Sequence, residues 1–202
     1  MNARRQRSDG LRSREAILRE AARMATVDGL GGLSLAHLAE AVGMSKSGLF
    51  AHFGSKEELQ LATIDTASAI FEELVIDAAA GAPAGVPRLR AYIERFLAHV
   101  EDGVFPGGCF FISAMSELDT HPGSVRDAAM AFTARWLDLL AAEVKAGQAA
   151  GELDPGADPG QVVFELNAFM VAGNIQFVAS GDQAALESVR RATASRLNPA
   201  LS

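Results

Sequence analysis

The stretch Leu33–Phe53, LSLAHLAEAVGMSKSGLFAHF, decides the fold because it reads as two short helices joined by a tight turn. Leu35, Leu38 and Val42 recur at i, i+3 and i+7, which places them on one face of a first helix. Gly43 follows directly and can adopt the left-handed backbone that ends a helix without strain. The pattern therefore predicts a helix that stops at a tight turn.

Two serines are placed to open the two helices of this stretch. The hydroxyls of Ser34 and Ser45 can each accept an otherwise unpaired backbone N–H of the following first turn. After Ser45, Leu49 and Phe53 lie four residues apart and form the inward face of the second helix. Helix, tight turn and helix at this length are typical of a DNA-reading motif. The less specific interpretation is an ordinary corner of a helical bundle.

The outer face of the second helix is small and almost uncharged. Opposite the inward residues lie Ser47, Gly48 and Ala51, so the backbone here can come close to a base-pair surface. Lys46 at the entrance and Lys56 just past the end can reach phosphates. The pattern favours a recognition helix over a merely structural one.

The whole chain is compatible with an all-α protein. It has 202 residues, of which 49% are hydrophobic, with apolar residues at helical spacing and no alternating run long enough for a sheet. No apolar run reaches the ~18 residues of a membrane span, and the N-terminus lacks the apolar core of a signal peptide. The single cysteine, Cys109, cannot form an internal disulfide. These features predict a soluble cytoplasmic protein with no membrane association. Beyond the motif, helices are predicted at about 13–27, 55–79, 88–101, 109–118, 124–149, 161–179 and 183–197.

The charge is unevenly distributed along the chain. The net charge is −7, yet residues 1–60 carry +2 and residues 61–202 carry −9. Such an asymmetry is expected when a small DNA-facing end is joined to an acidic body. We therefore predict a DNA-binding domain over 1–60, with a disordered basic arm at 1–11, and a second domain over 61–202. The alternative for the arm is a solvated tail with no specific role.

The motif and its neighbours resemble the TetR family of bacterial transcriptional regulators. The most specific part is MSKSGLFAHFGSKEEL, Met44–Leu59, preceded by Ser34, Ala39 and Gly43 at the family's spacing. One departure is Phe50, where the family often has a tyrosine whose hydroxyl reaches a phosphate. The resemblance therefore covers the N-terminal part closely, whereas the C-terminal part matches only in size and helical character.

The resemblance implies a three-helix DNA-binding unit, joined by a fourth helix to a ligand-binding and dimerisation domain. It also implies a homodimer that pairs two long helices of each subunit, here about 124–149 and 161–179, and that binds palindromic double-stranded DNA. The residues that it assigns to DNA binding are Ser34, Ser45, Lys46, Ser47, Gly48, Phe50, Ala51, His52 and Lys56.

Aromatic and polar residues within the apolar helices of the second domain are candidates for a small-molecule effector pocket. Buried polar groups need partners, so a polar side chain in an apolar helix can mark a ligand site. Simple core packing is the alternative for most of these residues, and a place at the dimer interface is the alternative for Asn174. The candidates are Phe105, Phe110, Met115, Phe132, Trp136, Asn167, Met170 and Asn174.

Two further residue patterns do not support a metal or cofactor. Glu117 and His121 lie four apart, but Pro122 ends the helix there and no second such pair exists. Cys109 could sense oxidants, although a buried structural role fits its apolar neighbours better. We therefore expect neither a metal nor a cofactor.

Together these patterns predict a ligand-responsive DNA-binding regulator, in the form of a repressor that a small, largely apolar molecule releases from its operator. The alternative is a helical small-molecule-binding protein or enzyme with a vestigial helix-turn-helix. The sequence shows no Ser/His/Asp arrangement, no G-x-S-x-G and no metal-ligand cluster. We therefore expect no enzymatic activity.

Overall fold

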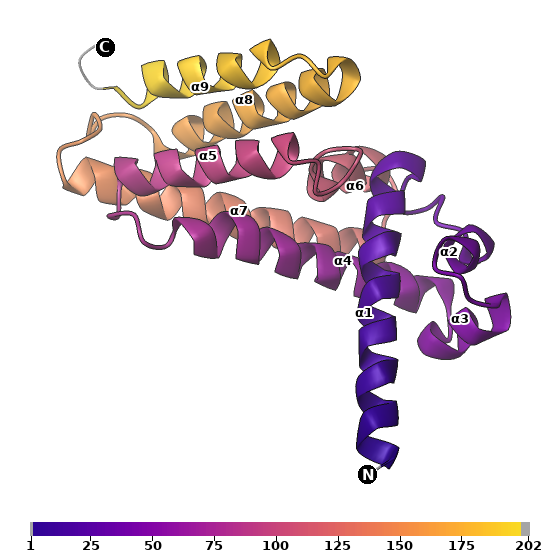
Figure 1. Ribbon diagram of the computed structural model, residues 1–202. Coiled ribbons are helices and arrows are strands. Elements are labelled where there is room, and N and C mark those ends of the chain that lie inside the picture. Colours follow the sequence, from indigo (N-terminus) through magenta and orange to yellow (C-terminus); the bar gives the residue numbers. More distant parts are fainter. Residues whose placement is uncertain (1, 199–202) are drawn as a thin grey trace. The chain divides into compact units, whose positions relative to one another are not determined.

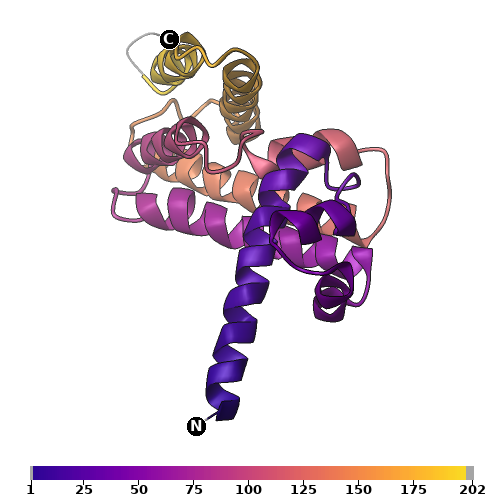
Figure 2. The same cartoon turned by 45° about the vertical axis from the view of Figure 1, so that its right-hand side comes forward.

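The computed structural model describes the backbone of residues 2–198, with side chains from Arg14 to Asn198. Every regular element in this part of the chain is helical, so the prediction of an all-α fold is confirmed (Figures 1 and 2). The elements are α1 (Asn2–Asp28), α2 (Leu35–Ala41), α3 (Lys46–Phe53), α4 (Lys56–Phe71), η1 (Glu72–Asp77), α5 (Val86–Glu101), α6 (Phe110–Leu118), α7 (Ser124–Ala149), α8 (Pro159–Ser180) and α9 (Ala184–Arg196).

Most helix boundaries match the predicted ones, with two differences. Helix α1 begins at Asn2 and not near Ser13, and the predicted basic arm at 1–11 falls among residues whose side chains are not described. The predicted helix over 55–79 is not uniform, because α4 ends at Phe71 and a π-helical segment, η1, continues it. Over only six residues, the spacing of apolar residues in a π-helix cannot be told from that in an α-helix, so the sequence did not predict this segment.

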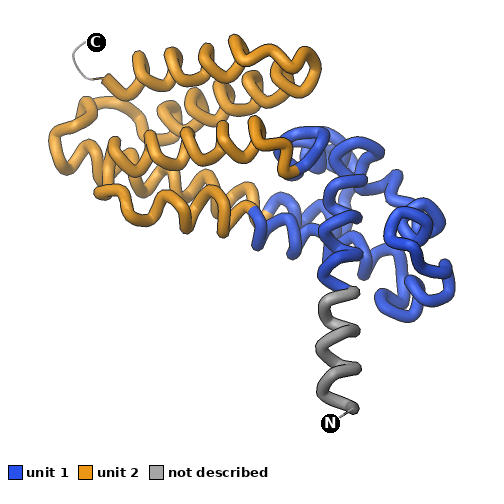
Figure 3. Tube along the Cα trace, in the orientation of Figure 1, with its two compact units in different colours: residues 1–70, 105–130 blue, residues 71–104, 131–202 orange. Residues whose placement is uncertain are grey.

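The chain forms two compact units, each made of two separate stretches of the sequence (Figure 3). The N-terminal unit comprises residues 1–70 and 105–130, and the C-terminal unit comprises residues 71–104 and 131–202. Helix α6 and the first turns of α7 therefore pack with the N-terminal helices. The functional boundary near residue 60 stays a prediction, since packing alone does not define a function.

In the N-terminal unit, the helix-turn-helix packs on α1. The inward residues Leu38, Leu49 and Phe53 are buried together with Ile17 and Leu18 of α1. Nine buried residues form this core, and several half-buried apolar side chains close its edges. Packing of the two short helices on α1 gives the motif the stability that isolated helices of seven and eight residues lack.

In the C-terminal unit, α8 and α9 pack along each other and both contact α5. By length and composition, α8 is the helix of the described residues that could span a membrane, with a mean hydropathy of 1.5 in its most apolar window. Polar residues such as Glu165, Asn167 and Asn174 interrupt it, which is why the sequence shows no continuous apolar run. Only one third of that window is buried within the chain, so much of its apolar surface is exposed.

Candidate nucleic-acid interface and ligand-binding core

The turn between α2 and α3 has the geometry that the sequence predicts. Gly43 adopts a left-handed backbone with φ of +67°, and the backbone N–H of Met44 donates to the carbonyl of Ala39 at 2.8 Å. Ser45 opens α3, because its hydroxyl accepts the N–H of Gly48 at 3.1 Å. Both observations fix the direction in which α3 leaves the turn.

The predicted cap at Ser34 is only partly correct. Ser34 occupies the position before α2, and its carbonyl accepts the N–H of Leu38 at 2.9 Å. Its hydroxyl, however, makes no capping hydrogen bond to α2. The half-buried Ser34 side chain thus lies at the start of α2 but accepts no backbone N–H of its first turn.

Helix α3 presents an outer face that matches the predicted recognition surface. Leu49 and Phe53 point into the core, with 0% and 3% of their surface exposed. The remaining predicted contacts on α3 are exposed or half-buried, and Phe50 is the largest of them, with 51% of its surface exposed. The structure therefore brings together Ser45, Lys46, Ser47, Gly48, Phe50, Ala51 and His52 on one short helix and its cap.

Lys56 has a structural contact that the sequence did not predict. Its amine donates to the carbonyl of Gly31, in the loop between α1 and α2, at 2.5 Å. Gln60, one turn further along α4, donates its amide N–H to the carbonyl of Leu30 at 2.8 Å. The start of α4 therefore holds two consecutive carbonyls of this loop while Lys56 stays exposed to solvent.

Glu117 of α6 binds backbone N–H groups of the same loop, and we call this arrangement the loop clamp. Its two carboxylate oxygens accept the N–H groups of Leu30 and Gly31, each at 2.6 Å. A Cβ added at Gly31 would lie 2.5 Å from that carboxylate, so a side chain at this position would displace the carboxylate of Glu117. The carboxylate is thus already engaged by the protein, and His121 bonds through Nδ1 to the backbone carbonyl of Glu117 at 3.1 Å. This clamp was missed in the sequence because 86 or more residues separate its partners.

A second connection joins α1 to the segment before α6. The N–H of Gly107 donates to the hydroxyl of Thr26 at 3.1 Å. A Cβ added at Gly107 would lie 1.9 Å from the carbonyl oxygen of Thr26, so only glycine fits. The end of α1 is therefore tied both to this segment and, through the loop, to α6.

The predicted effector residues are divided between the two units. In the N-terminal unit, the rings of Phe105 and Phe110 lie 6.2 Å apart and both are buried, whereas Met115 is half-buried. In the C-terminal unit, Phe132 and Trp136 pack edge-on against Phe71, with ring centroids 5.4 and 5.2 Å away. The two groups thus belong to different compact units.

Phe71 is the centre of an aromatic cluster that the pocket prediction did not identify. Besides the two predicted rings, Phe96 and His99 of α5 lie 6.5 and 5.8 Å from it between ring centroids. Tyr92 also contacts Trp136, at 5.5 Å. The sequence could have indicated the cluster, because Tyr92, Phe96 and His99 recur at i, i+4 and i+7 on one face of α5.

The aromatic cluster carries no charge near neutral pH. Burial lowers the pKa of His99 to about 4, and the nearby Asp102 only partly opposes this shift. Burial also raises the pKa of Tyr92, with Glu143 adding to the effect. An apolar or aromatic molecule fits such surroundings better than an ionic one.

On α8, the remaining pocket candidates are also core positions. Met170 and Asn174 are buried and Asn167 is half-buried.

Cys109, which directly precedes α6, is also buried, and burial raises the pKa of its thiol to about 11. The thiol therefore stays protonated near neutral pH, which favours the structural interpretation over a reactive one.

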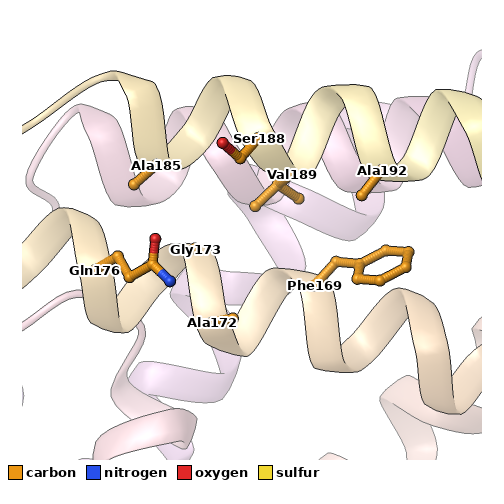
Figure 4. Close-up of a pocket in the computed structure, with 8 residues that line it drawn as sticks. All are labelled: Phe169, Ala172, Gly173, Gln176, Ala185, Ser188, Val189 and Ala192. Carbon is orange, nitrogen blue, oxygen red and sulfur yellow. The ribbon is translucent and has the colours of Figure 1, made fainter.

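An open groove runs between α8 and α9 (Figure 4). It has a volume of about 170 Å³, and small side chains such as Ala172, Ala185 and Ala192 line much of it. At Gly173, an added Cβ would lie 2.2 Å from a methyl carbon of Val189, so the glycine lets the two helices approach closely. Next to the groove, Phe164, Ile175 and Val178 are exposed.

Two protein-family models match different parts of the chain. Residues 17–63 match the model of bacterial regulatory proteins of the tetR family, and residues 85–193 match that of the tetracyclin repressor-like C-terminal domain. No curated protein sequence matches the chain.

Solved structures resemble the whole chain. A TetR transcriptional regulator from Chloroflexus aurantiacus is 25% identical, with a TM-score of 0.85 over 93% of this chain and 96% of that one. AibR, in complex with isovaleryl coenzyme A and operator DNA, is 25% identical, with a TM-score of 0.77 over 93% and 99%. A TetR-family regulator from Agrobacterium tumefaciens is 21% identical, with a TM-score of 0.83 over 93% and 98%, and supports the fold alone.

Proposed function

Because this chain belongs to the TetR family of transcriptional regulators, we propose that it is a cytoplasmic, non-enzymatic repressor that leaves its operator when a small molecule binds. The observation that carries the proposal is the outer face of α3. It exposes Lys46, Ser47, Phe50 and Ala51 while Leu49 and Phe53 anchor the helix in the core. A helix held in this way can enter the major groove without loss of its own packing.

The proposed DNA contacts fall into two classes. Lys46, Lys56 and Ser34 lie at the ends of α3 and at the start of α2, where they suit phosphates. Gly48 and Ala51, together with Ser45, let the backbone approach, whereas His52 can donate or accept a hydrogen bond. The clamp on the loop between α1 and α2 supports this assignment, because it fixes the position of the loop that leads directly into α2 and α3.

We propose that the protein acts as a homodimer through α8. Phe164, Ile175 and Val178 are exposed apolar side chains on this helix, and Ala168 and Ala172 continue their stripe at helical spacing. A second copy covers such a self-complementary stripe by two-fold symmetry. The groove between α8 and α9 adjoins the stripe and can accept an apolar side chain of the partner.

The second helix of the dimer interface has two candidates. The family resemblance favours α7 (124–149), on which Met130 is an exposed large apolar residue. The groove favours α9, whose Ser188 and Ala192 line it together with α8. We favour α9, because its small residues leave room for a partner helix, and the two choices predict different effects of substitution.

The effector that fits best is a neutral, largely apolar molecule. The aromatic cluster around Phe71 is uncharged near neutral pH, since His99 has its pKa lowered to about 4. The AibR structure contains isovaleryl coenzyme A, whose acyl group is apolar although its coenzyme is anionic. Short acyl thioesters are therefore a second class to test, of which only the acyl group would suit the aromatic cluster. Release would follow if the effector binds more tightly to the state that does not fit the operator.

Fluorescence anisotropy with the DNA that flanks the protein's own gene tests the proposal. We expect specific binding at low salt, competed weakly by unrelated DNA. Ala51→Glu, which places a negative charge on the outer face of α3, should abolish this binding, whereas Ala150→Glu, on the exposed surface after α7, should not. If the wild type binds no DNA specifically, the alternative of a ligand-binding protein with a vestigial motif is correct.

A further inference from the structure

Phe50 is exposed in a place where the fold does not need an aromatic side chain. Half of its surface, 51%, is open to solvent, although Leu49 and Phe53 on the same helix are buried. The exposed half of the phenyl ring gains nothing from folding, since it remains in contact with water. Its chemistry therefore points to a contact made outside the chain.

The surroundings of Phe50 combine an apolar wall with hydrogen-bond donors. Lys46, Ser47 and Phe50 line one shallow depression on the outer face of α3. Because they lie at i, i+1 and i+4 of one helix, Lys46 and Phe50 stand one above the other. The lysine amine has three donor hydrogens and no acceptor, whereas the phenyl ring has neither donor nor acceptor.

This combination matches one base edge in the major groove. A phenyl ring cannot hydrogen-bond a phosphate or a base, so it can recognise a base only by apolar contact. Thymine presents a C5-methyl group beside its O4 acceptor, whereas cytosine presents a donor at that edge. The apolar wall of the depression therefore complements thymine, which carries a methyl group at this edge.

We propose that Phe50 reads the methyl group of one thymine in each operator half-site, with Lys46 at the adjoining phosphate. The ring thus determines specificity in this protein, in place of the phosphate contact that a tyrosine hydroxyl would make. The proposal rests on the proposed function, because it requires specific DNA binding.

Replacement of thymine by deoxyuridine tests the contact, because it removes the methyl group and leaves every hydrogen bond of the base. The operator is first identified by selection from random duplexes, and each thymine of a half-site is then replaced in turn. For the wild type we expect one position per half-site at which the dissociation constant rises about fourfold, the value of one buried methyl group. Other positions should change by less than about twofold.

A double-mutant cycle links that position to Phe50. In Phe50→Ala, which removes an exposed side chain and should leave the fold intact, deoxyuridine at the sensitive position should have no further effect. Val27→Ala is the matched control, because Val27 is also exposed in the N-terminal unit but lies on α1. This variant should keep the full sensitivity, and circular dichroism checks that both variants are folded.

Three outcomes overturn the proposal. The first is specific binding with no thymine that is sensitive to deoxyuridine. The second is a sensitive thymine whose effect persists in Phe50→Ala. The third is a selected operator without a thymine in its half-sites. A wild type that binds no DNA specifically would instead refute the proposed function, so the two failures are distinguishable.

Discussion

Helices α3 and α8 both expose a phenylalanine, but in different surroundings. On α3, Phe50 stands alone among small and polar residues, with Lys46 one turn away. On α8, Phe164 begins a stripe that continues through Ile175 to Val178. A single ring beside a donor suits one chemical group of a polar ligand, whereas a long apolar stripe suits another helix of the same kind. The difference shows that the pattern around an exposed residue indicates its partner better than its exposure does.

The largest expected effect comes from a charge placed in the α8 stripe. Ile175→Asp should raise the dissociation constant of the dimer about a thousandfold, since two-fold symmetry buries the carboxylate twice. DNA binding should then weaken at least about a hundredfold, because a monomer holds only one half-site. Sedimentation equilibrium measures the first change and anisotropy measures the second.

Met130→Asp on α7 is the matched control for this prediction. Met130 is exposed to a similar degree as Val178, and the substitution adds the same charge. If Met130→Asp gives monomers while Ile175→Asp does not, then α7 and not α8 provides the main contact. A loss of dimers in both variants would indicate that α7 and α8 both form the interface, as the family resemblance implies.

A smaller effect is expected from the loop clamp, which supports α3 but not α8. Glu117→Ala leaves the N–H groups of Leu30 and Gly31 without their acceptor, and should lower the free energy of unfolding by about 1–2 kcal/mol because the site is partly solvated. DNA affinity should fall with it, while dimerisation stays unchanged. Urea denaturation gives the stability, and Glu117→Gln should recover part of the loss because its amide retains one acceptor oxygen.

Glu20→Ala is the control for the clamp. Its carboxylate forms an ion pair with Arg23 on α1, at 3.6 Å, with 38% and 48% of the two side chains exposed to solvent. We expect a change of less than about 0.5 kcal/mol, since such pairs contribute little. An equal loss in Glu20→Ala and Glu117→Ala would contradict a specific role for the clamp.

The sequence predicted what depends on local pattern. The helix periods, the turn at Gly43 and the cap at Ser45 all follow from residues within a few positions of each other, and the structure contains all three. The outer face of α3 follows in the same way, because one helix period separates the buried from the exposed side.

What the sequence did not reveal depends on contacts between distant segments. The clamp by Glu117 joins residues 87 positions apart, and the Phe71 cluster joins α5 and α7 to the end of α4. The pocket candidates Phe105 and Phe132 fall in different compact units, and the pocket stays a prediction. Residue type alone carries no information on which helices pack together, so contacts between distant segments could not be predicted from one sequence.

The smallest expected effect concerns the lysines, and it separates the positioning of DNA from the reading of its bases. Lys46→Ala should reduce the slope of log K against log salt by about 1.8 per dimer, which is two phosphate contacts, and should weaken all DNA sequences equally. Lys56→Ala should have a similar slope change and, in addition, a small loss of stability, because its amine also holds the carbonyl of Gly31.

The third lysine of the chain, Lys145, provides the control for this experiment, since it is exposed on α7 and outside the motif. Lys145→Ala should leave the slope unchanged, and so should Phe50→Ala, because a methyl contact releases no counterion. Titrations from low to physiological salt distinguish these cases. If Phe50→Ala flattens the slope as much as Lys46→Ala does, the ring positions the phosphate backbone and does not read a base. In that case α3 would still bind DNA and α8 would still bind a second copy of the protein, but Phe50 would not determine which DNA sequence is bound.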